Sequence, residues 1–247
     1  MSFIITLYTR EGIVMASDSR LTLNSEMRTP QGNRVLLAAG MSDSNYKTFL
    51  TKGGIGISTF GQAEISGNPV SGYIQSFISQ HTADKTTVTD FANELNAHFR
   101  TFNPIPDAGF HISGYEMENG SIKPKVYRVA PFHDMVELKN PENEKGEIQG
   151  ATWDGESDLL VRLIQPVFMR DQQKNYKPLP QYPIPWQFFT LQDAIDFAVF
   201  AIQMTIDCVR FFPRPKTVGG PVDVLVITRE KSFWVRRKEL KVNGRQL

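Results

Sequence analysis

Ser2, at the start of the chain, combines two groups that could do chemistry together. The small side chain of serine permits removal of the initiator Met1, which would leave Ser2 with a free α-amine beside its hydroxyl. Such a residue holds a nucleophile and a base in one place. Two apolar runs follow and end at Asp18-Ser19-Arg20, which adds a pair of opposite charges. Alone, this segment is more often a strand-end ion pair, which contributes little at a surface, and a serine at position 2 is common in proteins of all kinds.

Other patterns that would indicate chemistry fail in this sequence. Gly54 and Gly56 lack the third glycine of a dinucleotide-binding loop, because Thr59 stands there, and no phosphate-loop lysine follows. The G-x-S-x-G of a nucleophile elbow does not occur. Cys208 is the only cysteine, which excludes an intrachain disulfide. The four histidines show no metal-ligand spacing: His81, His98, His111 and His133. We therefore expect neither a metal nor a cofactor.

Composition indicates an ordinary soluble protein. Hydrophobic residues make up 40% of the 247 residues and charged residues 21%, and the formal net charge is +1. This charge gives no reason to expect nucleic acid or an anionic membrane as a partner. The longest mostly apolar segment, 194–212, is interrupted by charged residues and is too polar to span a membrane. With no secretory signal before the first strand, we expect a cytoplasmic protein.

Hydrophobic periodicity predicts the elements that must position Ser2 and the charged segment. The first half of the chain is predicted to contain an opening hairpin, a long excursion with its own strand pair, a glycine-rich strand and two helices. The hairpin covers 3–8 and 12–16, the excursion 21–45 and the strand 55–61. One helix covers 69–81, and the next begins near Thr87 or Thr89. Asn119-Gly120 between two alternating runs predicts a second hairpin, and 133–138 is a candidate strand.

The second half is predicted to contain a third helix over 154–169 and a Pro-rich insertion loop over 171–189, where prolines exclude helix. Thr190 to Asp193 resembles a capping box and opens the longest helix, which ends near Arg210. Two strands close the chain. The basic residues of this end are interpreted as a solvated strand margin: Arg229, Lys231, Arg236, Arg237, Lys238, Lys241 and Arg245.

The order of these elements predicts the fold class. Strands, two helices, strands, two helices and strands cannot form a regular alternation of strand and helix. We expect one α+β domain over residues 1–247. Its economical packing is a four-layer αββα sandwich of two mainly antiparallel sheets with a helix pair on each outer side.

Three segments resemble the proteasome-type N-terminal nucleophile (Ntn) hydrolases, the family of proteasome β-subunits, HslV and the bacterial homologue Anbu. They are Ser2 with 12–20, then 47–61, and lastly 219–228. Aligning the charged segment with its family counterpart puts the nucleophile at Ser2, and aligning Lys47-Thr48-Phe49 puts the oxyanion glycine at Gly61. The resemblance implies the Ntn hydrolase fold and peptide-bond hydrolysis. A nucleophile directly after Met1 is most similar to HslV and Anbu.

The same resemblance implies a role for each matched residue. The Ser2 α-amine would take the hydroxyl proton, and Lys47 beside it would hold the amine neutral and stabilise the alkoxide. Asp18 would keep Lys47 protonated, and Arg20 would brace the pair. The Gly61 N–H would face the oxyanion. Thr22, Thr59 and Ala63 would line an extended peptide, and Asp207 would be a second aspartate near the nucleophile. Family members act inside oligomers, so the resemblance implies a homo-oligomer, unfolded-protein substrates and a possible ATPase partner.

Two departures from the family pattern leave other functions open. The family's serine after the third strand group falls near Ala151-Thr152, and its serine before the late glycine pair is Val218 here. The chain could therefore be a subunit that kept the architecture and lost turnover. A third possibility is an amidohydrolase that acts on small non-peptide amides.

Overall fold

Two five-stranded antiparallel sheets form the centre of the fold. The computed structural model describes residues 2–28, 34–81, 86–142, 144, 146, 149–239, 241–242 and 245–246. The first sheet has the strand order β12, β1, β2, β15 and β16, which span Gly150–Gly155, Phe3–Tyr8, Ile13–Ser17, Asp223–Ile227 and Ser232–Arg236. The second has the order β11, β10, β9, β6 and β5, which span Met135–Leu138, Ser121–Ala130, Ala108–Glu118, Gly56–Gly61 and Thr48–Leu50.

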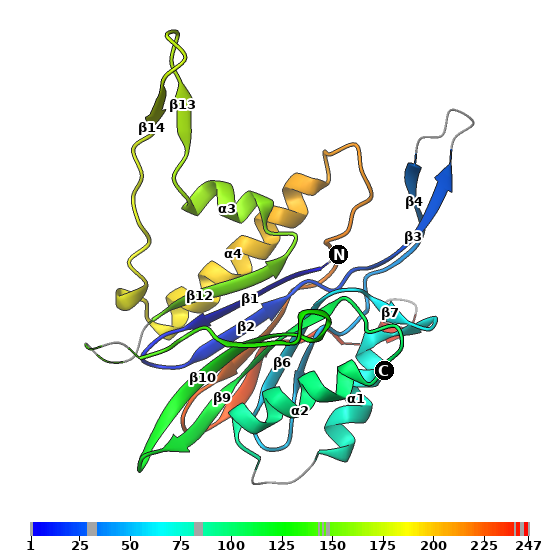
Figure 1. The fold of residues 1–247 in the computed structure, drawn as a ribbon, viewed down its shortest axis with the longest axis vertical. Coiled ribbons are helices and arrows are strands. Elements are labelled where there is room, and N and C mark those ends of the chain that lie inside the picture. The colour runs from blue at the N-terminus through cyan, green and yellow to red at the C-terminus, as the bar shows by residue number, and fades with distance from the viewer. Residues whose placement is uncertain are drawn as a thin grey trace.

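Four smaller strand pairs lie outside these sheets in the described residues. They are β3 with β4 (Leu21–Arg28 and Arg34–Ser42), β7 with β8 (Glu64–Ile65 and Asn68–Pro69), β13 with β14 (Phe168–Arg170 and Tyr176–Pro178), and β17 with β18 (Lys241–Val242 and Arg245–Gln246). In Figure 1 the β3–β4 and β13–β14 hairpins extend away from the body of the protein.

Four α-helices occur in the described part of the chain: α1 (Val70–Gln80), α2 (Val88–Arg100), α3 (Asp158–Ile164) and α4 (Leu191–Val209). Local capping explains where two of them begin. The Thr87 hydroxyl accepts a hydrogen bond from the Asp90 backbone N–H at the start of α2. Thr190 and Asp193 form a reciprocal capping box at the start of α4. Two short 3₁₀ helices, η1 and η2, span Pro131–His133 and Trp186–Phe188.

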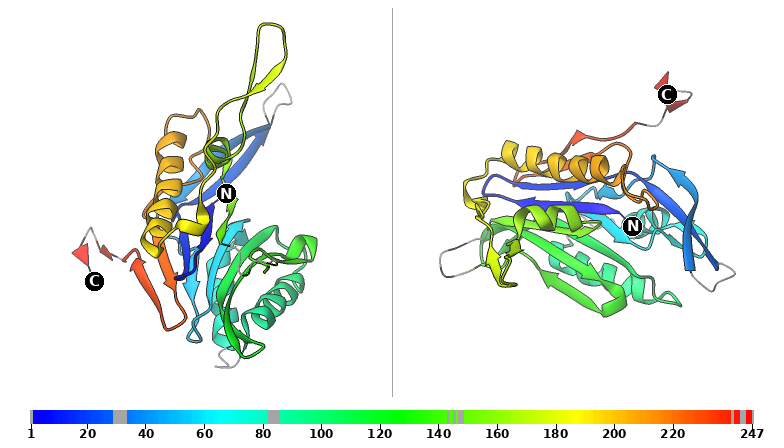
Figure 2. Two further views of the ribbon diagram at one scale, coloured as in Figure 1. Left: turned by 90° about the vertical axis from the view of Figure 1, so that its left-hand side faces the viewer. Right: turned by 90° about the horizontal axis from the view of Figure 1, so that it is seen from above.

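The apolar faces of the helices pack on the outer faces of the two sheets. One buried cluster joins α1 and α2 to β5, β6, β9 and β10, and it contains Phe77, Phe91, Phe99 and Phe110. A second joins α3 and α4 to β1, β2 and β15, and it contains Phe3, Leu160 and Ile202. Figure 2 shows these helix pairs on opposite sides of the molecule, with the strands between them.

The inner faces of the sheets meet through a third buried cluster, which includes Met15, Val126 and Leu225. Strand alternation directs Phe3, Ile5 and Leu7 of β1 to the α4 side. The residues between them face the other sheet.

The α+β class and the antiparallel sheets are confirmed, and so are the predicted opening hairpin, helices α1, α2 and α4, and the hairpin at Asn119-Gly120. The predicted helix over 154–169 is wrong over most of its length. Residues 150–155 pair with β1 as a strand, α3 covers only Asp158–Ile164, and Phe168–Arg170 is a strand. Pairing with β1 overrides the local helical pattern at residues 154–155, and pairing with β14 overrides it at residues 168–169. Within 171–189, the Pro-rich insertion holds β14 and η2.

No helix in the described ranges is long and apolar enough to cross a membrane.

Candidate active site

Ser2 lies next to Asp18 because β1 and β2 are adjacent antiparallel strands. Ser2 precedes β1 and Asp18 follows β2, so the two residues meet at the same end of these two strands. The Phe3 backbone N–H donates to Asp18 Oδ1 at 3.0 Å, and the Asp18 N–H donates to the Phe3 carbonyl at 3.2 Å. These two hydrogen bonds therefore hold the Asp18 carboxylate beside the first residues of the chain.

The Asp18 carboxylate is fully buried and accepts four hydrogen bonds. Lys47 Nζ donates to Oδ1 at 2.6 Å, in addition to the bond from Phe3. The backbone N–H groups of Arg20 and Gly219 donate to Oδ2 at 3.1 and 3.0 Å. A buried carboxylate needs such donors to replace water. Asp18 thus ties together β1, β5 and the segment that precedes β15.

Lys47 is the cation of this buried pair. Its side chain is 3% exposed, and its carbonyl accepts a hydrogen bond from the Thr59 N–H of β6. Burial lowers the pKa of Lys47, because it penalises the charged form, while the charge of Asp18 and its hydrogen bond oppose that effect. Lys47 is therefore a lysine that is held close to a carboxylate and releases its proton more readily than a solvated lysine.

A small pocket brings Ser2 and Lys47 together with two other residues of the sequence prediction, Thr59 and Ala63. The rest of its lining comes from the start of β3, the segment before β5, the end of β6 and α1: Leu21, Asn45, Phe60, Gln62, Val70 and Ser71. The Thr59 hydroxyl is buried and, within the described residues, makes no hydrogen bond. The pocket thus brings together Ser2, Lys47, Thr59 and Ala63, which are far apart in the sequence.

Gly61 ends β6, between the pocket residues Phe60 and Gln62. Its φ is +85°, and a Cβ there would lie 2.5 Å from the Asp107 carbonyl oxygen. Only glycine fits this left-handed backbone against β9.

Arg20 supports the site through its backbone and pairs elsewhere with its side chain. Its guanidinium forms a bidentate ion pair with Asp43, with both N···O distances at 2.7 Å. The planar group lies against Gly219, where a Cβ would be 2.4 Å from Arg20 Cζ. The late glycine pair therefore makes room for Arg20 and turns the Gly219 N–H toward Asp18. Asp43 was not predicted, because no local pattern marks it.

Gly155 and Glu156 lie beside Ser2. The register pairs Phe3 with Gly155, and the Glu156 N–H donates to the Ser2 carbonyl at 2.8 Å. Thr152 instead pairs with Thr6, deeper in the sheet. Thr152 therefore does not lie beside Ser2.

Glu156 is buried and was not singled out from the sequence. Arg214 holds it in a bidentate ion pair at 2.8 and 2.6 Å, and the Thr217 hydroxyl donates to the same carboxylate. The hydrogen bond from Arg214 lowers the pKa of Glu156. This contact packs the segment before β15 against the start of β1.

Asp207 and Thr22 are predicted site residues that, like Asp18 and Arg20, do not line the pocket. Asp207 lies on the exposed face of α4, where its carboxylate accepts a hydrogen bond from Gln203 at 2.9 Å. It does not join the Ser2 group. Thr22 is buried next to the pocket residue Leu21, but its hydroxyl donates to the Lys216 carbonyl at 3.1 Å. Met1 lies outside the described residues.

The prediction that the basic residues near the C-terminus form a solvated strand margin is wrong for Lys238. Its side chain is 4% exposed and forms an ion pair with the fully buried Asp223. Asp223 pairs in register with Ser17, the residue before Asp18. The charge of Lys238 also lowers the pKa of Lys47, although burial is the larger cause. The Lys238–Asp223 pair is thus a second buried Lys–Asp pair close to the Lys47–Asp18 pair.

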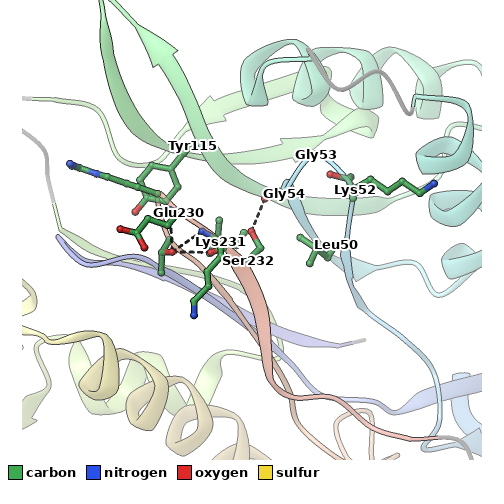
Figure 3. Close-up of a pocket in the computed structure, with 12 residues that line it drawn as sticks. Leu50, Lys52, Gly53, Gly54, Tyr115, Glu230, Lys231 and Ser232 are labelled. Atoms are coloured by element: carbon green, nitrogen blue, oxygen red, sulfur yellow. Dashed lines mark hydrogen bonds between the residues drawn. The ribbon is translucent and has the colours of Figure 1, made fainter.

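A larger polar pocket lies between the β5–β6 and β15–β16 turns (Figure 3). The Ser232 hydroxyl donates across it to the Gly54 carbonyl at 3.3 Å. None of the predicted site residues lines it. Within the described ranges, no group of three or more His, Cys, Asp or Glu residues is placed to hold a metal ion.

No protein-family model matches the sequence, and no curated protein matches it.

Proposed function

We propose that this chain is a proteasome-like N-terminal nucleophile hydrolase that cleaves amide bonds of peptides with Ser2. The observation that supports the proposal most is the shared pocket of Ser2 and Lys47, with Asp18 buried behind the lysine. Residues that are far apart in sequence and that the family resemblance selects together meet at one place. Chance placement of a surface serine would not bring a buried Lys–Asp pair beside it.

We also propose that the two sheets and their helix pairs form the αββα sandwich of the Ntn hydrolases. The three buried clusters support this, because two of them join a helix pair to one sheet and the third joins the sheets. The fold class alone does not identify an activity, because one fold can host many functions. The functional proposal therefore depends on the site.

The proposed reaction begins after removal of Met1. Ser2 Oγ bonds to the carbonyl carbon of the substrate amide while its proton passes to the Ser2 α-amine, whose ordinary pKa is about 7.7 to 8.0. The C–N bond then breaks, the leaving amine takes that proton, and an acyl ester remains on Ser2. Water attacks the ester, releases the acid and restores the hydroxyl.

Lys47, Asp18 and Gly61 supply the electrostatics of this scheme. The positive charge of Lys47 disfavours protonation of the neighbouring α-amine and stabilises the developing alkoxide. Asp18 holds the lysine in place with a 2.6 Å contact. The Gly61 N–H is proposed to bind the oxyanion, and loss of one such donor typically costs about 100- to 1,000-fold in rate.

The substrate is proposed to lie extended along β3 and the end of β6. Backbone groups near Thr22 and Thr59 would pair with it, as in strand addition. Since the Thr22 hydroxyl is occupied by Lys216, its side chain is a support rather than a substrate contact. Thr59 and the small Ala63 line the pocket with Ser2 and would contact the substrate residue at the cleavage site.

Labelling with an electrophilic probe for N-terminal nucleophiles tests this function. Protein from its native host should lack Met1 by intact mass, and the probe should add once, at Ser2. Ser2→Ala should abolish labelling. Ser71→Ala is the matched control, because Ser71 lines the same pocket but has no nucleophilic role, and it should label like the wild type.

Three results would overturn parts of this proposal. Uniform retention of Met1 would rule out this mechanism, because the Ser2 nitrogen would then be part of a peptide bond and could not accept the hydroxyl proton. Absence of labelling in Met1-free protein would favour a structural subunit. Turnover of small amides without cleavage of unfolded protein would change the substrate class.

A further inference from the structure

The β13–β14 hairpin and its flanking residues form an arm, residues 167–182, that presents apolar side chains to solvent. Six of them are at least 43% exposed: Val167, Phe168, Met169, Tyr176, Leu179 and Tyr182. Only three residue pairs join the two strands. A two-stranded hairpin of this size is marginal by itself in water, and a cluster of exposed apolar residues marks a contact surface.

The outer face of α4 carries a mainly apolar groove with an acid at each end. Val199, Phe200, Met204 and Cys208 line it together with Gln203, and Asp196 and Asp207 stand at its two ends. Eleven residues of helix separate the two carboxylates, which is about 16 Å. Strand residues 167–170 span about 10 Å, so an arm of this size fits between the two acids.

The charges of the arm and the groove are complementary. α4 contains three aspartates and no lysine or arginine. Asp196 and Asp207 each accept a hydrogen bond from a glutamine of the same helix, and neither has an ion-pair partner in the described residues. On the arm, Lys177 pairs with Asp171 at 3.2 Å, and the Arg170 guanidinium lies over the Tyr176 ring. Neither Arg170 nor Lys174 has an ion-pair partner in the described part of the chain.

We propose that the arm of one molecule docks into the α4 groove of a second copy of this chain. The arm extends away from the body in Figures 1 and 2 and does not fold back on α4 of its own chain. Apolar side chains of the arm would cover Val199, Phe200 and Met204, while Arg170 and Lys174 would meet Asp196 and Asp207. Each molecule carries both surfaces, so two copies can exchange arms. The contact does not depend on catalysis by Ser2.

Charge reversal on each surface tests the contact by sedimentation velocity. Arg170→Glu/Lys174→Glu makes the arm acidic, and Asp196→Lys/Asp207→Lys makes the groove basic. We expect each variant alone to associate at least tenfold more weakly than the wild type. An equimolar mixture of the two variants should associate again, because an acidic arm then meets a basic groove and the remaining unaltered arm and groove also match.

Apolar substitutions provide the second test and its matched control. Phe168→Ser/Met169→Ser should weaken association by a similar factor. Met117→Ser/Ile122→Ser changes two exposed apolar residues on the β9–β10 hairpin instead and should leave association unchanged. A monomeric wild type at tens of micromolar would overturn the proposal. So would wild-type association of either charge variant alone, or a mixture that stays dissociated while both variants retain the wild-type circular dichroism spectrum.

Discussion

A single buried carboxylate, that of Asp18, links three parts of the candidate site. It accepts hydrogen bonds from the backbone of Phe3, Arg20 and Gly219 and from the side chain of Lys47. The Asp18 side chain is fully buried, and that of Lys47 is only 3% exposed. Removal of one partner from such a pair leaves an uncompensated charge in the interior.

Asp18→Asn should therefore destabilise the fold strongly. The substitution leaves Lys47 without a counter-ion and places an amide N–H against backbone N–H donors. We therefore expect a loss of about 3 to 5 kcal/mol in the free energy of unfolding. In Asp18→Asn/Lys47→Met the loss should be smaller than the sum of the two single losses, because the second change removes the orphaned charge. Urea titration measures all three variants.

The Arg20–Asp43 pair supplies the control for this cycle. It has similar chemistry but is partly exposed, so Asp43→Asn should cost at most about 1 kcal/mol. Strict additivity in the Asp18 and Lys47 cycle would show that the two residues are not coupled.

Among the elements, the pairing of β1 with β12 positions the first residues of the chain. Gly155 ends β12 opposite Phe3 and has a φ of +91°. A Cβ at this position would lie 1.7 Å from the Ser2 carbonyl oxygen. The close approach allows the Glu156 N–H to reach the same oxygen. Ser2 is thus held by the end of a strand from the middle of the chain.

Gly155→Ala should displace Ser2, whereas Gly120→Ala should not. Both glycines have positive φ, and this conformation alone costs alanine about 1 to 2 kcal/mol. At Gly120 nothing lies within 4 Å of the Cβ position. We expect the larger loss of stability, and the loss of probe labelling at Ser2, only for Gly155→Ala. Equal unfolding free energies and full labelling in both variants would contradict this role of Gly155.

At the scale of the whole molecule, a polar network crosses between the two sheets. His111 of β9 is fully buried between Thr6 of β1 and Asp154 of β12, with both contacts at 3.0 Å. Arg128 of β10 holds the same aspartate in a bidentate ion pair. Since the Asp154 carboxylate only accepts, the neutral imidazole donates from Nε2 and accepts from the Thr6 hydroxyl at Nδ1.

This network makes the stability depend on pH. Burial lowers the pKa of His111 and outweighs the opposing effect of Asp154. The unfolded chain regains the ordinary value of about 6.5. As the pH falls below that value, the unfolded state binds the proton first, so the unfolding free energy declines. Between pH 7.5 and 5.5 we expect His111 to contribute a decline of up to about 1.4 kcal/mol.

His111→Gln measures this contribution. The variant should be less stable at both pH values but should lose less stability between them than the wild type. His133→Gln replaces an exposed imidazole in the same way and serves as its control. The same pH dependence in His111→Gln and the wild type, read from urea midpoints at the two pH values, would show that the pKa of His111 does not differ between the folded and unfolded states.

The sequence predicted the elements whose signals are local. Thr87 caps α2, the Thr190–Asp193 capping box opens α4, and Asn119-Gly120, both with positive φ, turns between β9 and β10. Each signal depends on a few neighbouring residues. Where strand pairing competes with the local pattern, the prediction failed, as it did at residues 154–155 and 168–169.

By itself, the sequence determined the α+β class, the order of most elements and which residue types could take part in catalysis. Tertiary structure alone decided which of them meet. Lys47 and Lys238 are both lysines with polar neighbours in the sequence. Both are buried against aspartates, 29 and 15 residues away, whereas Asp207 remains on an exposed face. Burial and charge pairing depend on residues that folding brings together from separate parts of the chain, so local sequence patterns do not predict them.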